Sequence, residues 1–108
     1  MTTEEKLKEF NQTLKKTRMP VAQGSFELPQ KPPYISWVVE DRSEIFADAK
    51  NYVELLNIQV ELYTTKKDPS SEALLENVLR KSEIKYTVSD EGFLSDSKLY
   101  AVFYEMEV

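Results

Sequence analysis

The chain has 108 residues, of which 41% are apolar and 31% charged, and its formal net charge is -5. This length suits one domain with its own hydrophobic core, and the composition is that of a globular rather than a disordered protein. The chain contains neither cysteine nor histidine, which excludes disulfides, thiolate metal ligands and imidazole general bases. The net negative charge argues against a protein that binds nucleic acid by covering its phosphates.

The first third of the sequence predicts a helix over residues 1–18 and an extended lead-in over residues 19–33. Thr2 and Glu5 have the spacing of a capping box at the start of the helix. Its apolar stripe is narrow, so we expect it to dock on a sheet edge or a neighbour rather than fill a core. The stripe consists of Leu7, Phe10 and Leu14. Three prolines then hold the lead-in extended.

A strand and a long connection are predicted next. Residues 34–41 alternate as a strand, and the connection over residues 42–51 is about twice the usual hairpin length. Ile45 and Phe46 are large apolar residues in this polar segment, close to Asp48 and Lys50. Such residues either fold back onto the sheet or contact another chain. These four residues are the candidate contacts with another subunit or a partner.

The centre of the sequence predicts a strand followed by a helix. Leu56, Ile58, Val60 and Leu62 alternate with polar residues, which is typical of a half-buried strand. Asp68-Pro69 then has the form of a helix start, with a capping carboxylate before a proline that needs no donor.

Two further strands complete the chain, one around residues 84–88 and one over residues 99–108, with a turn expected at residues 90–92. The predicted order is α-β-β-α-β-β, so residues 1–108 form a single domain in which residues 34–108 hold the sheet and the central helix. We expect an α+β fold with a mainly antiparallel sheet of about four to five strands and two helices on one face.

Equipment for catalysis is not evident in the sequence. Glu40 and Asp41 are adjacent in a strand and point to opposite faces, while Glu105 and Glu107 share a face but lie at the end of the last strand. Two isolated glycines cannot make a phosphate-binding loop. We therefore expect no enzyme, no catalytic residues, no cofactor and no metal site. No apolar run reaches the roughly 20 residues that span a bilayer and no signal peptide opens the chain, so we expect a cytoplasmic protein without a membrane contact.

Three stretches carry a resemblance to a known family. They are PPYISWVVEDRSEIFADAKNY, IQVELYTTKKDPSSEALLENVL and KLYAVFYEMEV, and they cover about residues 20 to 108. The combination resembles the tail-terminator and tail-completion proteins of long-tailed phages and prophages of Gram-positive bacteria. The matching positions are Pro33-Tyr34, Ala47-Asp48 with Tyr52, Val60 to Thr64 with Lys67-Asp68, Glu72 with Glu76, and Tyr100 to Glu105.

The resemblance implies a function and partners. It implies a structural virion protein that ends the tail tube and joins the tail to the head as a hexameric ring. Its partners would then be further copies of itself, the tail tube protein and the head-tail connector protein, without sequence-specific binding of nucleic acid. We expect a monomer in isolation, located in the host cytoplasm during assembly and afterwards in the virion tail. The alternative is a small monomeric adaptor or inhibitor domain, of a phage or its host, that binds one protein partner.

Overall fold

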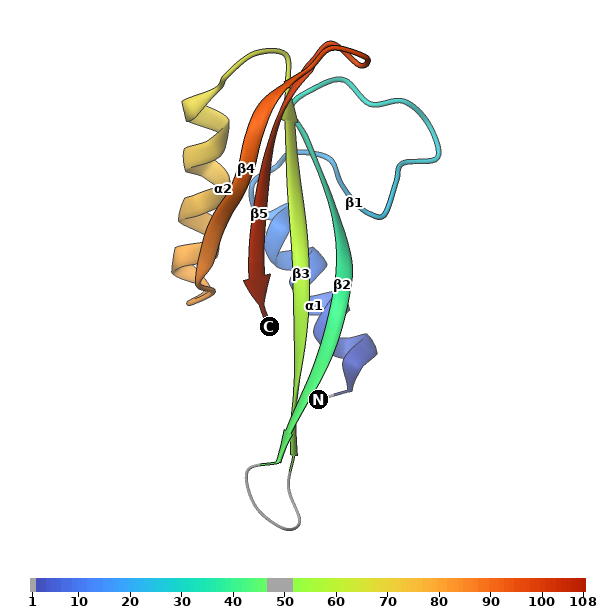
Figure 1. Cartoon of the computed structure of the whole chain (residues 1–108), viewed down its shortest axis with the longest axis vertical. Coiled ribbons are helices and arrows are strands. Elements are labelled where there is room, and N and C mark those ends of the chain that lie inside the picture. The colour runs from blue at the N-terminus through green and yellow to red at the C-terminus, as the bar shows by residue number, and fades with distance from the viewer. Residues whose placement is uncertain (1, 47–51) are drawn as a thin grey trace.

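The structure of the chain is a computed structural model that describes residues 2–46 and 52–108, with side chains for residues 2–42 and 54–108. Two helices and five strands follow one another along the chain (Figure 1). They are α1 (Thr3–Lys15), β1 (Val21–Gln23), β2 (Tyr34–Phe46), β3 (Tyr52–Thr64), α2 (Pro69–Lys81), β4 (Tyr86–Leu94) and β5 (Leu99–Glu107).

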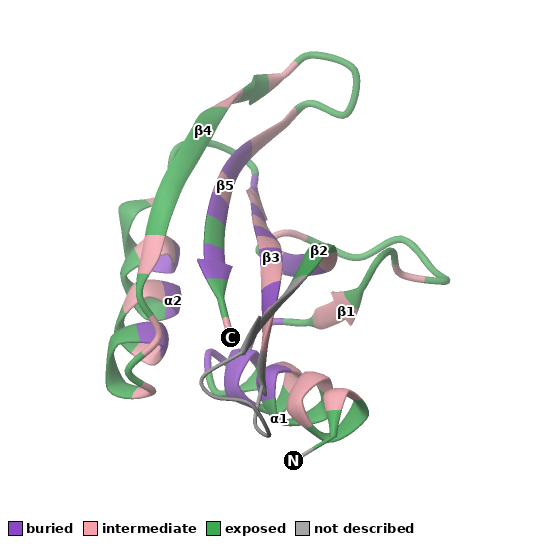
Figure 2. Cartoon of the chain, turned by 60° about the horizontal axis from the view of Figure 1, so that its bottom comes forward, coloured by how far each residue is buried: buried purple, intermediate pink, exposed green. Residues whose placement is uncertain are grey.

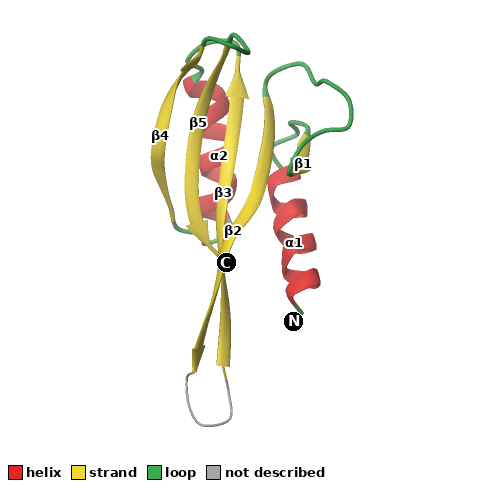
Figure 3. Cartoon of the chain, turned by 45° about the vertical axis from the view of Figure 1, so that its right-hand side comes forward, coloured by secondary structure: helices red, strands yellow, loops and turns green. Residues whose placement is uncertain are grey.

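The five strands form one sheet in the order β1-β2-β3-β5-β4. The short β1 runs parallel to β2, and every other neighbouring pair is antiparallel. Figure 3 shows α2 behind the strands and α1 beside the edge of the sheet formed by β1 and β2. Both helices pack side chains into the same core cluster, so they belong to the same face of the sheet. The predicted α+β class with a mainly antiparallel sheet is confirmed, and the extended lead-in contributes β1 to its edge.

The core lies between the helices and the face of the sheet that they cover. Its middle is Val60 in β3, which is flanked by Trp37 of β2 and Tyr104 of β5. All three side chains are at most 1% exposed. Figure 2 shows the same arrangement, because the buried residues of both helices and of the central strands face one another. The predicted facing of the central strand is therefore confirmed.

Helix α1 belongs to this core and not merely to its edge. The hydroxyl of Thr2 accepts a hydrogen bond from the backbone N–H of Glu5 at 3.1 Å, as the capping-box spacing predicts. Phe10 lies edge-on to Trp37, with ring centroids 5.1 Å apart, and Leu14 is fully buried. The prediction that a narrow stripe would dock only on an edge or a neighbour is wrong, because these side chains are long enough to reach the tryptophan under the helix.

Helix α2 begins where the sequence predicts. The carboxylate of Asp68 accepts hydrogen bonds from the backbone N–H of Ser71 at 3.1 Å and from its hydroxyl at 2.8 Å. These bonds hold the pKa of Asp68 below its usual value. Pro69 occupies the first turn, and Leu75 and Leu79 are fully buried against the sheet.

Two segments predicted as loop are strand where the structure describes them. The expected connection over residues 42–51 is wrong for residues 42–46, because β2 continues to Phe46; residues 47–51 lie outside the described residues, and β3 begins at Tyr52. The expected turn at residues 90–92 lies within β4, where the register shifts between Val88 and Asp90. Both segments are rich in polar residues, so their composition resembles that of a loop. The turn between β4 and β5 lies over residues 95–98.

Candidate interaction surfaces

A two-stranded ribbon, made by the outer parts of β2 and β3, is the most prominent feature of the surface (Figure 1). The last strand, β5, ends beside it, and the backbones of Val108 and Leu56 exchange hydrogen bonds of 2.8 and 3.0 Å. Beyond this pair, β2 and β3 are paired only with each other among the described residues, up to Phe46 opposite Tyr52. We call this part, residues 42–46 and 52–55, the ribbon. Among the described residues no further strand pairs with its outer edges, where another chain could add one; on the β3 side α1 already contacts the backbone oxygen of Glu54.

The first turn of α1 supports the root of the ribbon. The ammonium group of Lys6 donates a hydrogen bond to the backbone oxygen of Glu54 at 2.9 Å, and the hydroxyl of Thr3 donates to the Glu54 carboxylate. These hydrogen bonds hold the base of the ribbon against α1, so the position of the ribbon relative to the rest of the domain is defined.

The four predicted contact residues separate into two groups. Ile45 and Phe46 belong to the ribbon, where their backbones pair with Val53 and Tyr52. Asp48 and Lys50 lie outside the described residues. The prediction that Ile45 and Phe46 contact another chain is untested, although its original reason, a long loop, no longer applies.

The face of the sheet opposite the helices has no covering helix, and we call it the helix-free face (Figure 3). Its upper half is covered by the segment between β1 and β2. The rings of Tyr34 and Tyr63 are stacked with centroids 5.1 Å apart, and Phe26 packs edge-on against Tyr34. Burial, reinforced by the carboxylate of Glu61, raises the pKa of Tyr63 to about 12. A phenol of this kind stays neutral and packs as a largely apolar group.

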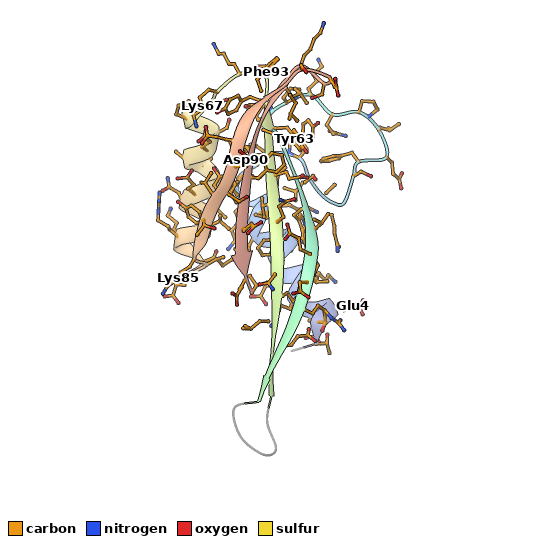
Figure 4. The ribbon with its side chains drawn as sticks, viewed as in Figure 1. Glu4, Tyr63, Lys67, Lys85, Asp90 and Phe93 are labelled. Atoms are coloured by element: carbon orange, nitrogen blue, oxygen red, sulfur yellow. The ribbon has the colours of Figure 1, made fainter. Side chains whose placement is uncertain are left out.

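The lower half of the helix-free face is an acidic hollow of about 760 Å³. It runs across the sheet from the irregular pairing near Glu40 in β2 to the start of β4. Five carboxylates line it, and Lys85 is its one ammonium group among the described residues; Figure 4 shows Lys85 at the lower end of β4. The carboxylates are those of Glu40, Asp41, Glu83, Glu105 and Glu107. Among the side chains that the structure places, ion pairs are found only at Lys67, so none of these five carboxylates forms an ion pair with a described side chain.

A polar cluster joins the start of α2 to the β4–β5 hairpin, at the upper end of the domain (Figure 4). The ammonium of Lys67 lies 2.9 Å from a carboxylate oxygen of Glu72 and 2.7 Å from one of Glu91. Tyr100 donates its hydroxyl to the same Glu91 carboxylate. The hydrogen bonds to Glu91 and Glu72 raise the pKa of Lys67, and the bond from Lys67 lowers that of Glu91. Lys67 therefore links Glu72 of α2 to Glu91 of β4, so the cluster fixes the helix to the hairpin.

A second cluster fixes the middle of α2 to the sheet. Glu76 accepts hydrogen bonds from the hydroxyls of Tyr104, at 2.9 Å, and Tyr86, at 3.1 Å. Arg80 donates to the Tyr86 hydroxyl at 3.2 Å. Burial, with a smaller effect of Glu76, raises the pKa of Tyr104 well above its usual value. A buried phenol that donates to a fixed carboxylate is a structural group, because it offers neither a base nor a nucleophile near neutral pH.

Sequence reasoning missed both the ribbon and the acidic hollow. Glu105 and Glu107 were identified as sharing a face, and that much is confirmed because both are exposed while Met106 between them is buried. The sequence alone does not give the strand order. In the sheet, β3 lies between β2 and β5, and this order brings Glu40 and Asp41 of β2 into the same hollow as Glu105 and Glu107 of β5.

Within the described residues, no group of histidine, cysteine or carboxylate side chains has the arrangement of a metal site. Neither described helix is both long and apolar enough to span a membrane. No protein-family model matches the chain, and no curated protein matches it.

Proposed function

We propose that this chain is a structural virion protein that ends the tail tube of a long-tailed phage or prophage and joins the tail to the head. In this proposal it acts as a hexameric ring whose partners are further copies of itself, the tail tube protein and the head-tail connector protein. It assembles in the host cytoplasm and is then part of the virion tail. The residue pattern described above and the surfaces of the fold support this function together.

The observation that carries the proposal is the ribbon. An isolated pair of strands is marginally stable in water, and the unpaired backbone groups at its edges can pair with a strand of another chain. A projecting element of this kind suits a protein whose task is to hold neighbours in an assembly. Its root is tied to α1 through Lys6 and Glu54, so the fold presents the ribbon in a defined direction before any partner binds.

Several of the described positions that carry the resemblance lie at structurally important points; Ala47 and Asp48 lie outside the described residues. Pro33-Tyr34 opens β2, and the segment from Val60 to Asp68 runs from the middle of the core to the cap of α2. Glu76 anchors α2 to the last strand. The resemblance is therefore one of architecture, and it supports an assembly role more directly than a chemical one.

The net charge of the chain also fits a ring through which DNA passes. A ring around the path of the genome works best if DNA passes without adhering, and a net charge of -5 per copy gives weak repulsion. Ring closure requires a head-to-tail contact related by rotation, and such a ring stops growth when its far side offers no repeat of the tube surface.

Deletion of the gene tests this proposal. We expect DNA-filled heads without attached tails, together with free tail tubes of abnormal length, when lysates are examined by electron microscopy. A copy of the gene supplied from a plasmid should restore joined particles and serves as the control. Normal infectious particles from the deletion would refute the tail role and favour the monomeric adaptor instead.

A further inference from the structure

We propose that the acidic hollow on the helix-free face of one copy receives the basic end of α1 from the next copy. The basic end is defined as Lys15, Lys16 and Arg18. The inference rests on the proposed ring for its biological setting, and it names the two surfaces that meet between neighbouring subunits.

The basic end is exposed and held in place. All three of its side chains are exposed, and within the described part of the chain none of them forms an ion pair. The hydroxyl of Thr17 donates to the backbone oxygen of Leu14 at 2.8 Å and accepts from the backbone N–H of Met19 at 3.2 Å. The backbone N–H of Arg18 donates to the Lys15 oxygen at 3.0 Å. These bonds fix the chain around the cations, so little order has to be gained on binding.

A protein surface that covers the acidic hollow must supply cations. Its five carboxylates face one ammonium group, and packing an apolar or acidic surface over them would leave unpaired charges away from water. Nucleic acid is excluded as the occupant by the sign of the charge. The chain itself carries a matching surface, because residues 1–18 hold five Lys and Arg residues against three Glu.

The two surfaces are separate within one copy. The basic end lies at the C-terminal end of α1, which packs beside β1 at one edge of the sheet, whereas the hollow extends across the sheet to β4 at the other edge. Glu83 and Glu107 of the hollow also border a pocket beside Lys6 and Thr13 of α1, but among the described side chains no ion pair joins the hollow to the basic end. A patch and its complement at different places on one chain produce a head-to-tail contact, which either closes into a ring or continues as a filament. Exposed charge pairs contribute little and are screened by salt. The contact is therefore weak in solution and accumulates in a ring only where a tail tube aligns the copies.

Charge reversal tests the contact in solution. One variant carries Lys15→Glu with Lys16→Glu, and the other carries Glu105→Lys with Glu107→Lys; all four positions are exposed. Self-association is measured by analytical ultracentrifugation at high protein concentration and about 10 mM salt, where screening is weakest. We expect the wild type to associate and each variant alone to associate several-fold more weakly.

A mixture of the two variants gives the decisive result. In the mixture, the unchanged basic end of one variant meets the unchanged hollow of the other, so half of the contacts in an alternating ring of even number are those of the wild type. In the other half, the reversed end meets a hollow in which three carboxylates are offset by three ammonium groups, so the repulsion of each variant alone is relieved. We expect the mixture to associate more strongly than either variant alone, and we expect this association to disappear at physiological salt.

A matched control places the same change of charge elsewhere. Lys66→Glu with Lys98→Glu alters two exposed lysines outside the contact, and it should leave association near the wild-type level. Thermal melts of every variant confirm folding. Absence of wild-type association at low salt, or a mixture that associates no better than its components, would overturn the proposed contact.

Deletion of the gene and association of the mixture test the tail role and the contact between copies separately. If the mixture associates but deletion of the gene leaves normal tails, the contact stands and the tail role fails. If deletion abolishes joining but the mixture does not associate, the tail role stands and the contact is wrong.

Discussion

Replacing Val60 by aspartate tests the centre of the fold. The side chain is 0% exposed and lies between Trp37 and Tyr104. Losing the burial of a valine costs about 1.5–3 kcal/mol, and a polar group without a partner in its place adds about 1–3 kcal/mol. We therefore expect Val60→Asp to lower the free energy of unfolding by roughly 3–5 kcal/mol at pH 7. This is a large part of the stability of a small domain.

The loss should depend on pH with a defined sign. Burial penalises the ionised carboxylate, so the folded-state pKa of the new aspartate lies above its unfolded value of about 3.9. Above that value the folded state keeps a proton that the unfolded state has released, and stability falls as the pH rises. Relative to the wild type, the variant should recover up to about 2.7 kcal/mol between pH 7 and pH 5, at about 1.4 kcal/mol per pH unit.

Urea denaturation at both pH values, with the wild type measured alongside, gives these differences. Val60→Asn is the matched control, because it is polar and of similar size but does not titrate; its loss should be the same at both pH values. A loss below about 1 kcal/mol for Val60→Asp would show that water or a partner reaches this position. A loss that does not change with pH would show that the carboxylate is not buried as the structure has it.

Three further predictions concern other parts of the molecule. Tyr104→Phe removes a buried hydroxyl that donates to Glu76, and urea denaturation should show a loss of about 1 kcal/mol; no loss would mean that the bond contributes nothing. Asp68→Ala removes the cap of α2 and should lower the melting temperature at pH 7, and this loss should shrink as the pH is lowered below about 3.8, because the bonded carboxylate has a lowered pKa and its stabilisation is lost as the pH falls through that lowered value. Asp68→Asn is its control, since it keeps an acceptor without titrating. The double variant Ile45→Ser and Phe46→Ser should melt near the wild-type temperature yet block incorporation into virions, whereas a large drop in melting temperature would place these residues in the core of their own chain.

Parts of the fold that alternate or are capped could be predicted from the sequence. The apolar face of β3 and the start of α2 at Asp68-Pro69 are local patterns, and both are confirmed. The extension of β2 through Arg42, Ser43 and Glu44 could not be predicted, because these three residues are polar and show no apolar alternation. The sequence also predicts too early an end for the fourth strand, around residue 88 instead of Leu94, for a related reason. It is an edge strand with mostly exposed residues, so its acidic segment has the composition of a turn.

The candidate interaction surfaces were harder to predict from the sequence than the fold, because they combine residues that are far apart in the chain. Ile45 and Phe46 were selected for their size in a polar segment, but only the register with Val53 and Tyr52 places them on a ribbon. The acidic hollow combines residues that are more than 60 positions apart in the chain, and their proximity follows from the strand order rather than from any local pattern.

The ribbon and the centre of the sheet should also differ in the free energy at which their backbone hydrogen bonds open. In the middle of β3, each amide belongs to a strand paired on both sides over a packed core, so its hydrogen exchanges only when the whole domain unfolds. In the ribbon, beyond Leu56 and Val108, the described strands are paired only with each other. Their amides should exchange through local opening at a much smaller free energy. A binding partner that adds a strand there would slow exchange at the ribbon alone and leave the exchange of central β3 unchanged, so the ribbon can respond to assembly independently of the core.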